Sequence, residues 1–209
     1  GFFLFQAGFP YAEIRLTVAG STVALTVLVL SIVRHRTVEA AEEKAQLART
    51  DSLTGLPNMR RLRDRLEFEV GRCAETGEGL ALLMLDLDDF KTVNDRHSHW
   101  IGDKTLVAVA DAIESVCRHA DMPARRGGDE FAIVMTGAAA DQAEIAAERV
   151  ALAIRMARIN VVPDVNPDAS VGWTVWRPGE TVDELIADSD DRLHDAKSES
   201  YRARQLEHA

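Results

Sequence analysis

The sequence predicts an α/β fold, a sandwich in which helices flank one mixed β-sheet. A continuous apolar run from Leu80 to Leu85 is typical of a strand that is buried on both faces. A glycine pair at 127–128 lies between two further apolar runs and predicts a β-hairpin. Segments with helical periodicity separate these strands, so helices are expected to pack against a central sheet.

The individual elements follow from the same patterns. Apolar residues recur at helical spacing from Met59 to Val70, and Asn58 is the candidate N-cap of that helix. The remaining elements are predicted in this order: a strand at 80–86, a short helix and loop, a helix at 103–119, the hairpin, a helix at 143–157, a strand at 169–176 and a helix at 182–197.

The main part of the chain is acidic. The chain has 209 residues, 46% of them hydrophobic, and a net charge of −10, which allows one sizeable core and a small appendage. Residues 1–50 carry five Lys/Arg and four Asp/Glu, so the acidic excess lies in residues 51–209. This argues against nucleic acid as a partner, because phosphate backbones need Lys and Arg clusters, but it leaves room for a single nucleotide. Cys73 and Cys117 fall on predicted apolar helix faces and are expected to be buried free thiols.

The first fifty residues differ in kind from the rest. Residues 16–33 carry no charge and are followed by Arg34-His35-Arg36; as a helix these eighteen residues span about 27 Å. We expect a transmembrane helix here, with the following domain on the cytoplasmic side of the inner membrane; a buried or interfacial helix is the alternative. Residues 1–15 are interpreted as the tail of a preceding apolar segment and a loop, which makes the chain a fragment of a longer protein. Residues 34–50 are expected to form a linker helix, either solvated or weakly paired with a second copy, and 205–209 a tail.

The hairpin carries two acids at its tip. Arg126-Gly127-Gly128-Asp129-Glu130-Phe131 predicts strand, tight turn and strand, and its glycines allow positive φ and close approach of another group. Carboxylates in this position suit a hard cation such as Mg²⁺, which prefers oxygen ligands. An ordinary turn with solvated acids is the alternative.

A second acidic segment ends the strand at 80–86. It reads Asp86-Leu87-Asp88-Asp89-Phe90-Lys91, and Asn94, Asp95 and Gly102-Asp103 follow shortly after. Acids at the end of a buried strand, facing a glycine hairpin, are the arrangement that nucleotidyl-transfer sites use to hold metal ions. A strand-end turn acid is the alternative for Asp86. His97 and His99 lack a third ligand at suitable spacing and are interpreted as loop histidines.

Taken together, five motifs in this order resemble the GGDEF domain, the diguanylate cyclase family. They are Asp51-x-Leu-Thr-Gly-Leu-x-Asn58, Asp86-x-Asp-x-Phe-Lys91-x-x-Asn94-Asp95, His99-x-x-Gly102-Asp103, Gly127-Gly-Asp-Glu-Phe131 and Ala196-Lys197. The resemblance covers residues 51–204 and implies a fold similar to a nucleotide-cyclase or polymerase palm.

The resemblance implies a reaction, a cofactor and partners. Two GTP molecules condense to cyclic di-GMP with loss of pyrophosphate, with Mg²⁺ (or Mn²⁺) as cofactor, at the interface of a homodimer. Asp129 and Glu130 are then catalytic, and Asp86, Asp129 and the Leu87 carbonyl bind the metal. GTP binding is assigned to Asp89, Phe90, Lys91, Asn94, Asp103, Gly127, Gly128, Lys197 and Arg202. For each lysine, simple exposure to solvent is the alternative.

The resemblance also implies a product-inhibition site at Arg118, Asp121 and Arg149, where cyclic di-GMP binds. An ordinary helix-end ion pair is the alternative for Arg118 and Asp121.

The chain departs from the family pattern in three places. Ser98 replaces the glycine of the family's Gly-His, Arg192-Leu193-His194 replaces its Ala-Leu-Tyr, and Ser200-Tyr201-Arg202 displaces the phosphate-binding arginine by one residue. One residue on a helix is a rotation of about 100°, so weakened activity is expected. The alternatives to an active, membrane-tethered cyclase are a non-catalytic receptor for GTP or cyclic di-GMP, and a cyclase of relaxed base specificity, against which Asp103 favours guanine.

Overall fold

The computed structural model describes residues 25–36, 49–157 and 165–207. The chain divides into two compact units, Gly1–Ala48 and Arg49–Ala209. In the first unit, residues 25–36 form a helix. Among the residues described, no helix has the length and apolarity needed to cross a membrane. The transmembrane helix predicted over 16–33 is therefore not found in the described part, although residues 16–24 lie outside it, as do 1–15 and most of the predicted linker.

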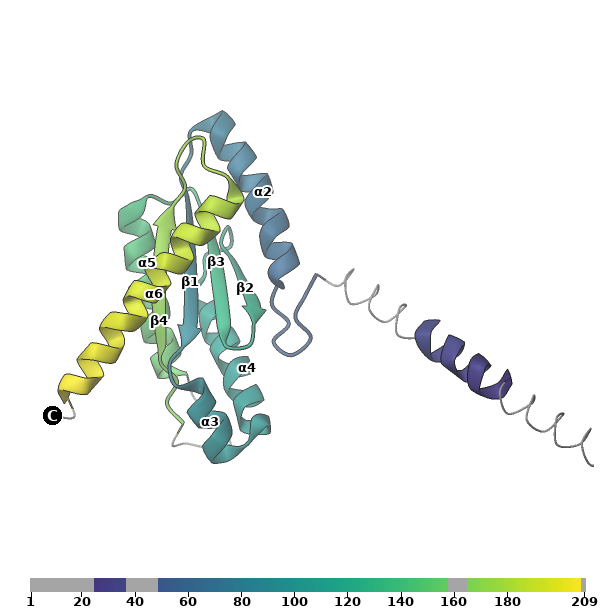
Figure 1. The fold of residues 1–209 in the computed structure, drawn as a ribbon. Helices are drawn as coiled ribbons and strands as arrows, with labels where there is room; N and C mark the ends of the chain where they lie inside the picture. The colour runs from purple at the N-terminus through teal and green to yellow at the C-terminus, as the bar shows by residue number, and fades with distance from the viewer. Residues whose placement is uncertain (1–24, 37–48, 158–164, 208–209) are drawn as a thin grey trace, which may run out of the picture. The chain divides into compact units, whose positions relative to one another are not determined.

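The second unit is a four-stranded sheet between two layers of helices (Figure 1). Its elements are, in chain order, α2 (Met59–Thr76), β1 (Leu80–Leu87), α3 (Phe90–His97), α4 (His99–Val116), β2 (Met122–Gly127), β3 (Glu130–Thr136), α5 (Ala140–Met156), β4 (Ala169–Val175) and α6 (Val182–Glu207). Each strand and helix predicted between residues 59 and 197 is present. Asn58 caps α2 as expected, since its side chain accepts a hydrogen bond from the N–H of Arg61 at 3.1 Å.

The prediction of a mixed sheet is wrong for the described strands. The order is β2-β3-β1-β4, and all three pairings of neighbouring strands are antiparallel. The physical reason lies in the crossover. The two helices after β1 carry the chain past one strand position, so β2 runs parallel to β1 but β3 lies between them. Interleaved helices and strands predicted the layers correctly but not which strands would be neighbours.

The alternating side chains of β1 build two cores. Leu80, Leu82 and Met84 pack in one cluster with residues of α2 and α6, such as Leu66 and Leu185. The odd-numbered residues from Ala81 to Leu87 pack in the other cluster with residues of α4 and α5. Because successive side chains of a strand point to opposite faces, the buried run predicts both layers at once. Figure 1 shows α6 crossing one face of the sheet and α5 lying behind the other.

Both predicted thiols are free cysteines, with Cys73 buried and Cys117 half-buried. The last helix is longer than its periodicity predicted, continuing from Lys197 to Glu207.

Candidate functional site

Asp86 and Glu130 face the same helix from neighbouring strands. They are directly opposite each other in the β1–β3 register, and opposed residues of an antiparallel pair share a face of the sheet. Asp86 continues the alternation of Leu82 and Met84, which belong to the cluster packed with α2 and α6 residues. Both carboxylates are therefore on the α6 side of the sheet.

The turn of the glycine hairpin contacts the end of β1. Gly127 and Gly128 have φ values of 151° and 56°, which only glycine adopts without strain, so the predicted positive φ of this pair is confirmed. The N–H of Leu87 donates to the carbonyl oxygen of Asp129 at 3.3 Å. Strand pairing thus brings the acids at 86, 129 and 130 together, as the sequence predicted.

The side chain of Arg125 stabilises this turn through hydrogen bonds. Its Nε and Nη2 donate to the carbonyl oxygen of Gly128 at 3.1 and 2.7 Å, and its Nη1 donates to Asp51 at 2.9 Å. Asp51 also accepts from the N–H and hydroxyl of Thr54 at 2.9 and 2.7 Å. Burial raises the pKa of Asp51, but the hydrogen bonds from Thr54 and Arg125 outweigh it and hold the pKa below its ordinary value. The first sequence motif is therefore a support of the hairpin.

The positively charged side chain of a lysine lies beside Asp86. The Nζ of Lys197, on α6, is 2.8 Å from Oδ2 of Asp86. Burial raises the pKa of Asp86 above its ordinary value, and the neighbouring Asp129 and Glu130 add to the rise while Lys197 opposes it. Positive charge at this point of the site is electrostatically favoured, because three acids converge there.

Asp86 opens onto a cavity of about 260 Å³, which neither Asp129 nor Glu130 lines; its lining residues are Asp86, Leu87, Asp88, Asp89, Lys197 and Tyr201. Among the described residues, no three His, Cys, Asp or Glu side chains are already arranged around a metal position. The donors nevertheless fit a hard divalent cation, since carboxylates and a backbone carbonyl are its preferred ligands and substrate phosphates supply the remainder. The ion pair between Lys197 and Asp86 shows that a positive charge is stabilised beside this carboxylate.

Asn94 and Asp103, predicted to read the base, come from two helices that touch. Asn94 is half-buried on α3, and a Cβ built on Gly102 would lie 2.0 Å from its Oδ1. A side chain at 102 would displace the amide of Asn94, so glycine there leaves room for that amide. Asp103, the next residue, is exposed.

Three other predicted GTP-binding residues form the start of α3. Asp89 is its N-cap with φ 55°, Phe90 is its first residue, and Lys91 is exposed. Asp89 lines the acidic cavity, whereas Lys91 does not.

The residues of the predicted product-inhibition site lie around Cys117. The N–H of Arg118 donates to Asp121 at 2.9 Å, so a backbone turn, rather than an ion pair between side chains, explains their spacing. Burial raises the pKa of Cys117 to about 12; the charge of Asp121 adds to the rise and that of Arg149 opposes it. The Nε of Arg149 is buried without a hydrogen-bond partner among the described residues. The three residues are thus close together around Cys117.

The far end of the site differs from the family pattern. Tyr201, which is exposed, lines the acidic cavity, whereas the predicted phosphate ligand Arg202 is exposed and does not. Ser200 donates to Asp88 at 3.4 Å and Ser170 donates to the same carboxylate at 2.9 Å. Tyr201 thus stands at the position where the resemblance implies an arginine, and its phenol lines the cavity.

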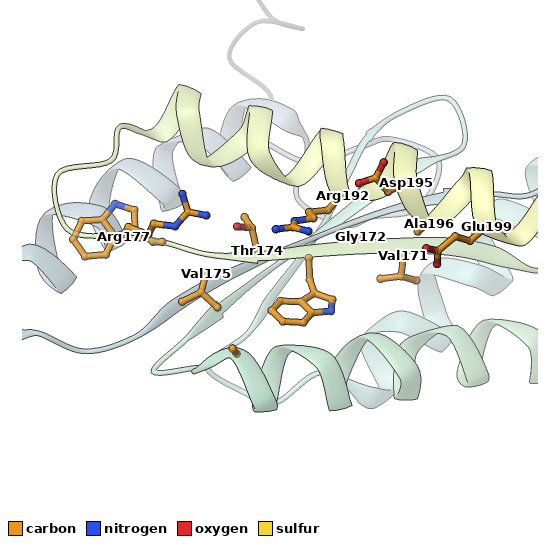
Figure 2. Close-up of a pocket in the computed structure, with 12 residues that line it drawn as sticks. Val171, Gly172, Thr174, Val175, Arg177, Arg192, Asp195, Ala196 and Glu199 are labelled. Atoms are coloured by element: carbon orange, nitrogen blue, oxygen red, sulfur yellow. The ribbon is translucent and has the colours of Figure 1, made fainter.

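A larger pocket of about 560 Å³ is lined mainly by residues of β4 and α6 (Figure 2). Figure 2 shows Arg192, Asp195 and Glu199 on α6 above the strand residues Val171 and Thr174. None of the predicted catalytic or GTP-binding residues lines this pocket. We place the chemistry at the smaller cavity because it contains Asp86 and Lys197.

Comparison with known proteins agrees with this geometry. Residues 48–202 match the family model described as "Diguanylate cyclase, GGDEF domain". The chain belongs to this family. Relatives that carry this domain include proteins named as diguanylate cyclases.

Two curated relatives show the extent of the match. An uncharacterized signaling protein of Caulobacter vibrioides is 39% identical over 181 residues, which are 84% of this chain and 22% of that protein. The diguanylate cyclase DgcP of Pseudomonas aeruginosa is 35% identical over 157 residues, 75% of this chain and 23% of that protein. The chain thus spans about a quarter or less of these two relatives.

Solved structures share the fold. The diguanylate cyclase SiaD of Pseudomonas aeruginosa, in complex with its activator SiaC, has a TM-score of 0.70 and 33% identity and covers 90% of this chain and 80% of its own. The GGDEF domain of DgcB from Caulobacter crescentus, in complex with c-di-GMP, has a TM-score of 0.69 and 28% identity, covering 73% and 89%.

Sequence reasoning missed the residues that support the site. Arg125 holds the turn, and Arg126 forms an ion pair with Asp190 at 2.6 Å. Both arginines precede the glycine pair, so their position was a usable signal. Asp190 lies 64 residues from Arg126, and nothing in its local pattern identifies it.

Proposed function

We propose that the chain is an active cyclase domain that condenses two GTP molecules into cyclic di-GMP and two pyrophosphates. One observation carries this proposal: Asp86 and Glu130 are opposed across β1 and β3, with Asp129 on the adjoining turn. Oxygen ligands are thereby gathered where a triphosphate must be neutralised, next to an acid that can accept a proton.

Each acid has a separate task in this mechanism. Glu130 accepts the proton of a 3′-hydroxyl, whose oxygen attacks the α-phosphorus of the other GTP. The bond from that phosphorus to the bridging oxygen breaks and pyrophosphate leaves. Asp86, Asp129 and the Leu87 carbonyl would hold a divalent cation, as cyclases of this family use, and we propose Mg²⁺ or Mn²⁺. Such a cation supplies neutralisation of the phosphate charge.

The cations and glycines position the triphosphate. Lys197 lies 2.8 Å from Asp86 and is free to turn toward a phosphate once another charge satisfies that carboxylate. Cβ atoms built on Gly127 and Gly128 would meet nothing within 4 Å, so the backbone of the turn is open to a phosphate. Lys91 is assigned the same task, and Asn94 and Asp103 are assigned the guanine edge, which suits an amide and a carboxylate.

Dimerisation is part of the proposal. One domain binds one GTP, so two copies must face each other for the two attacks. Arg118, Asp121 and Arg149 are proposed to bind the product, cyclic di-GMP, and so hold copies apart. Their grouping around Cys117 supports this, as does the suitability of arginine for guanine edges and phosphates.

Attachment to the inner membrane is also a proposal. It is supported by the uncharged residues 16–33 and the basic residues that follow them. Under this proposal the cyclase domain lies on the cytoplasmic side.

A receptor without catalysis is the second candidate. Tyr201 lines the cavity at the phosphate end, whereas Arg202 does not, and this favours weak turnover with retained binding of GTP or cyclic di-GMP. The receptor keeps the product-binding and base-reading residues but makes no product.

Product formation separates the two. The purified chain is incubated with GTP and Mg²⁺, with a phosphodiesterase present to remove inhibiting product, and the nucleotides are resolved by chromatography. We expect cyclic di-GMP and its hydrolysis product from GTP, and far less product from ATP if Asp103 selects guanine. GTP binding without any turnover, even in an artificially dimerised chain, would establish the receptor instead.

A further inference from the structure

We propose that Arg126 and Asp190 form a positioning pair that keeps the carboxylate of Glu130 available to the substrate. The inference rests on the proposed cyclase function and assigns to it two residues that touch neither metal nor GTP in the mechanism above. The pair connects the active-site hairpin to α6, 64 residues further along the chain.

The backbone of β2 directs Arg126 toward α6. The register of β2 against β3 shifts between Arg125 and Gly127, so Arg126 occupies a bulge. Ala124, two residues earlier, packs in the cluster with residues of α2 and α6, so the alternation of the strand places Arg126 on the same side of the sheet. Arg126 lies over the sheet, with 20% of its side chain exposed and Nη1 4.0 Å from the sulfur of Met84.

Asp190 binds the guanidinium through its two terminal nitrogens. Nη1 and Nη2 of Arg126 donate to the two carboxylate oxygens of Asp190 at 2.6 and 3.3 Å. Two parallel hydrogen bonds between charged groups fix direction as well as distance. The guanidinium therefore has a defined orientation rather than that of a mobile surface arginine.

The same Nη1 is 3.9 Å from Oε2 of Glu130. That distance allows electrostatic attraction but exceeds a hydrogen bond. Asp190 thus keeps Arg126 close to Glu130 but too far away to form a hydrogen bond with its carboxylate. Without Asp190, Arg126 is only four residues from Glu130 across the turn and can bind its carboxylate directly, which removes the acceptor that the 3′-hydroxyl needs.

Helix α6 joins both acids of the site through this pair. Asp190 acts on Glu130 through Arg126, and Lys197, seven residues later on the same helix face, contacts Asp86 at 2.8 Å. A movement of α6 would disturb both carboxylates together. The pair therefore fixes the helix in the position at which Lys197 also reaches the site.

Kinetics of the full chain test the role in catalysis. Asp190→Asn is expected to lower kcat by about tenfold, because the released Arg126 then binds Glu130, whereas Arg126→Gln is expected to lower it by no more than about threefold; KM for GTP changes less than about twofold in both, since the pair touches no substrate. The combined variant is expected to be less impaired than Asp190→Asn alone, because it has no Arg126 to bind Glu130. The charge-reversed variant, Arg126→Asp with Asp190→Arg, is expected to recover the thermal midpoint but not kcat, because it places an acid beside Glu130.

An ion pair elsewhere on α6 provides the matched control. Arg63 on α2 contacts Asp183 on α6 at 2.5 Å, and Arg63→Gln and Asp183→Asn are expected to leave kcat unchanged. Unchanged kcat in Asp190→Asn, or a combined variant as impaired as Asp190→Asn alone, overturns the positioning role while the cyclase function stands, as does full recovery of kcat in the charge-reversed variant.

Thermal unfolding tests the geometry without turnover. The coupling between Arg126 and Glu130 is measured by combining Arg126→Gln with Glu130→Gln, first in the native background and then with Asp190→Asn. We expect it to be near zero in the first and to reach a non-additive shift of about 2–4 °C in the second. Equal coupling in both backgrounds overturns the inference, and an inactive native chain overturns the proposed function without affecting this measurement.

Discussion

The glycine hairpin and the second half of α6 close the same site from two sides, and they differ in how completely they keep the family's pattern. In the hairpin, Arg125 holds the carbonyl of Gly128 through two hydrogen bonds and is itself held by Asp51. At the end of α6, Tyr201 lines the cavity and Arg202 does not. The acids are thus fixed in place, while the phosphate end has changed its chemistry. We infer that the chain retains the acids that the proposed reaction needs and binds the triphosphate of GTP more weakly.

The largest expected loss of product formation comes from removing an acid of the hairpin. Asp129→Ala is expected to lower cyclic di-GMP formation by at least about 1,000-fold, since an acid that neutralises transition-state charge is worth several kcal/mol. Product is quantified by chromatography after incubation with GTP and Mg²⁺. The loss should occur without unfolding, which circular dichroism checks. Appreciable turnover in this variant would show that the acids of the turn are not the reaction centre.

Lys197 joins the two sides, and its removal has an intermediate effect. Lys197→Met takes away the ammonium that lies 2.8 Å from Asp86. We expect Mn²⁺ to bind more tightly in the absence of GTP, because no side chain competes for Asp86, while turnover falls by roughly tenfold. Electron paramagnetic resonance of Mn²⁺ measures the first change. Weaker Mn²⁺ binding in the variant would contradict the position given to Lys197.

Restoring the family's pattern on α6 has a smaller and opposite effect. Ser200→Gly combined with Tyr201→Arg places a guanidinium where the phenol now lines the cavity. The KM for GTP is expected to fall by roughly three- to tenfold, as one charge-assisted contact to phosphate is gained. Tyr201→Phe serves as a control that should leave KM unchanged. An unaltered KM in the double variant would mean that the α6 end does not limit GTP binding.

The contact between Asp51 and Arg125, which supports the hairpin, affects folding stability more than catalysis. Asp51→Asn is expected to destabilise the fold by roughly 2 kcal/mol, because the charged hydrogen bonds to Thr54 and Arg125 are lost. The folded-state pKa of Asp51 is below its ordinary value, so folding favours the ionised form. Its contribution is complete above the ordinary pKa of about 3.8 and disappears as the pH falls through the lowered value. The difference in urea midpoint between the native chain and the variant should therefore shrink in acid.

The sequence predicted the parts of the site that follow from local pattern. A buried run ending in Asp86 defines a strand and its terminal acid, and a glycine pair before Asp129 defines a turn with positive φ. The neighbours of each strand depend on how crossover helices route the chain, so the antiparallel sheet could not be read from the alternation of elements.

Long-range support of the site was equally hidden from the sequence. Asp190 is one of several acids at the start of α6, and only packing shows that it, rather than Asp188 or Asp191, meets Arg126. The rotation of Tyr201 into the cavity follows from helix phase and was partly predictable, since the displacement of Arg202 by one residue was evident.

The measurement that bears most directly on the acid site is turnover of Asp86→Asn compared with its stability. Burial raises the pKa of Asp86, so at neutral pH the folded state holds an ionised carboxyl at a cost that the neutral amide avoids. We expect the variant to unfold at the same temperature as the native chain or a higher one, and yet to form no detectable cyclic di-GMP. Native-like turnover in a stably folded Asp86→Asn variant would contradict the assignment of this acid, and with it the reaction centre proposed for the chain.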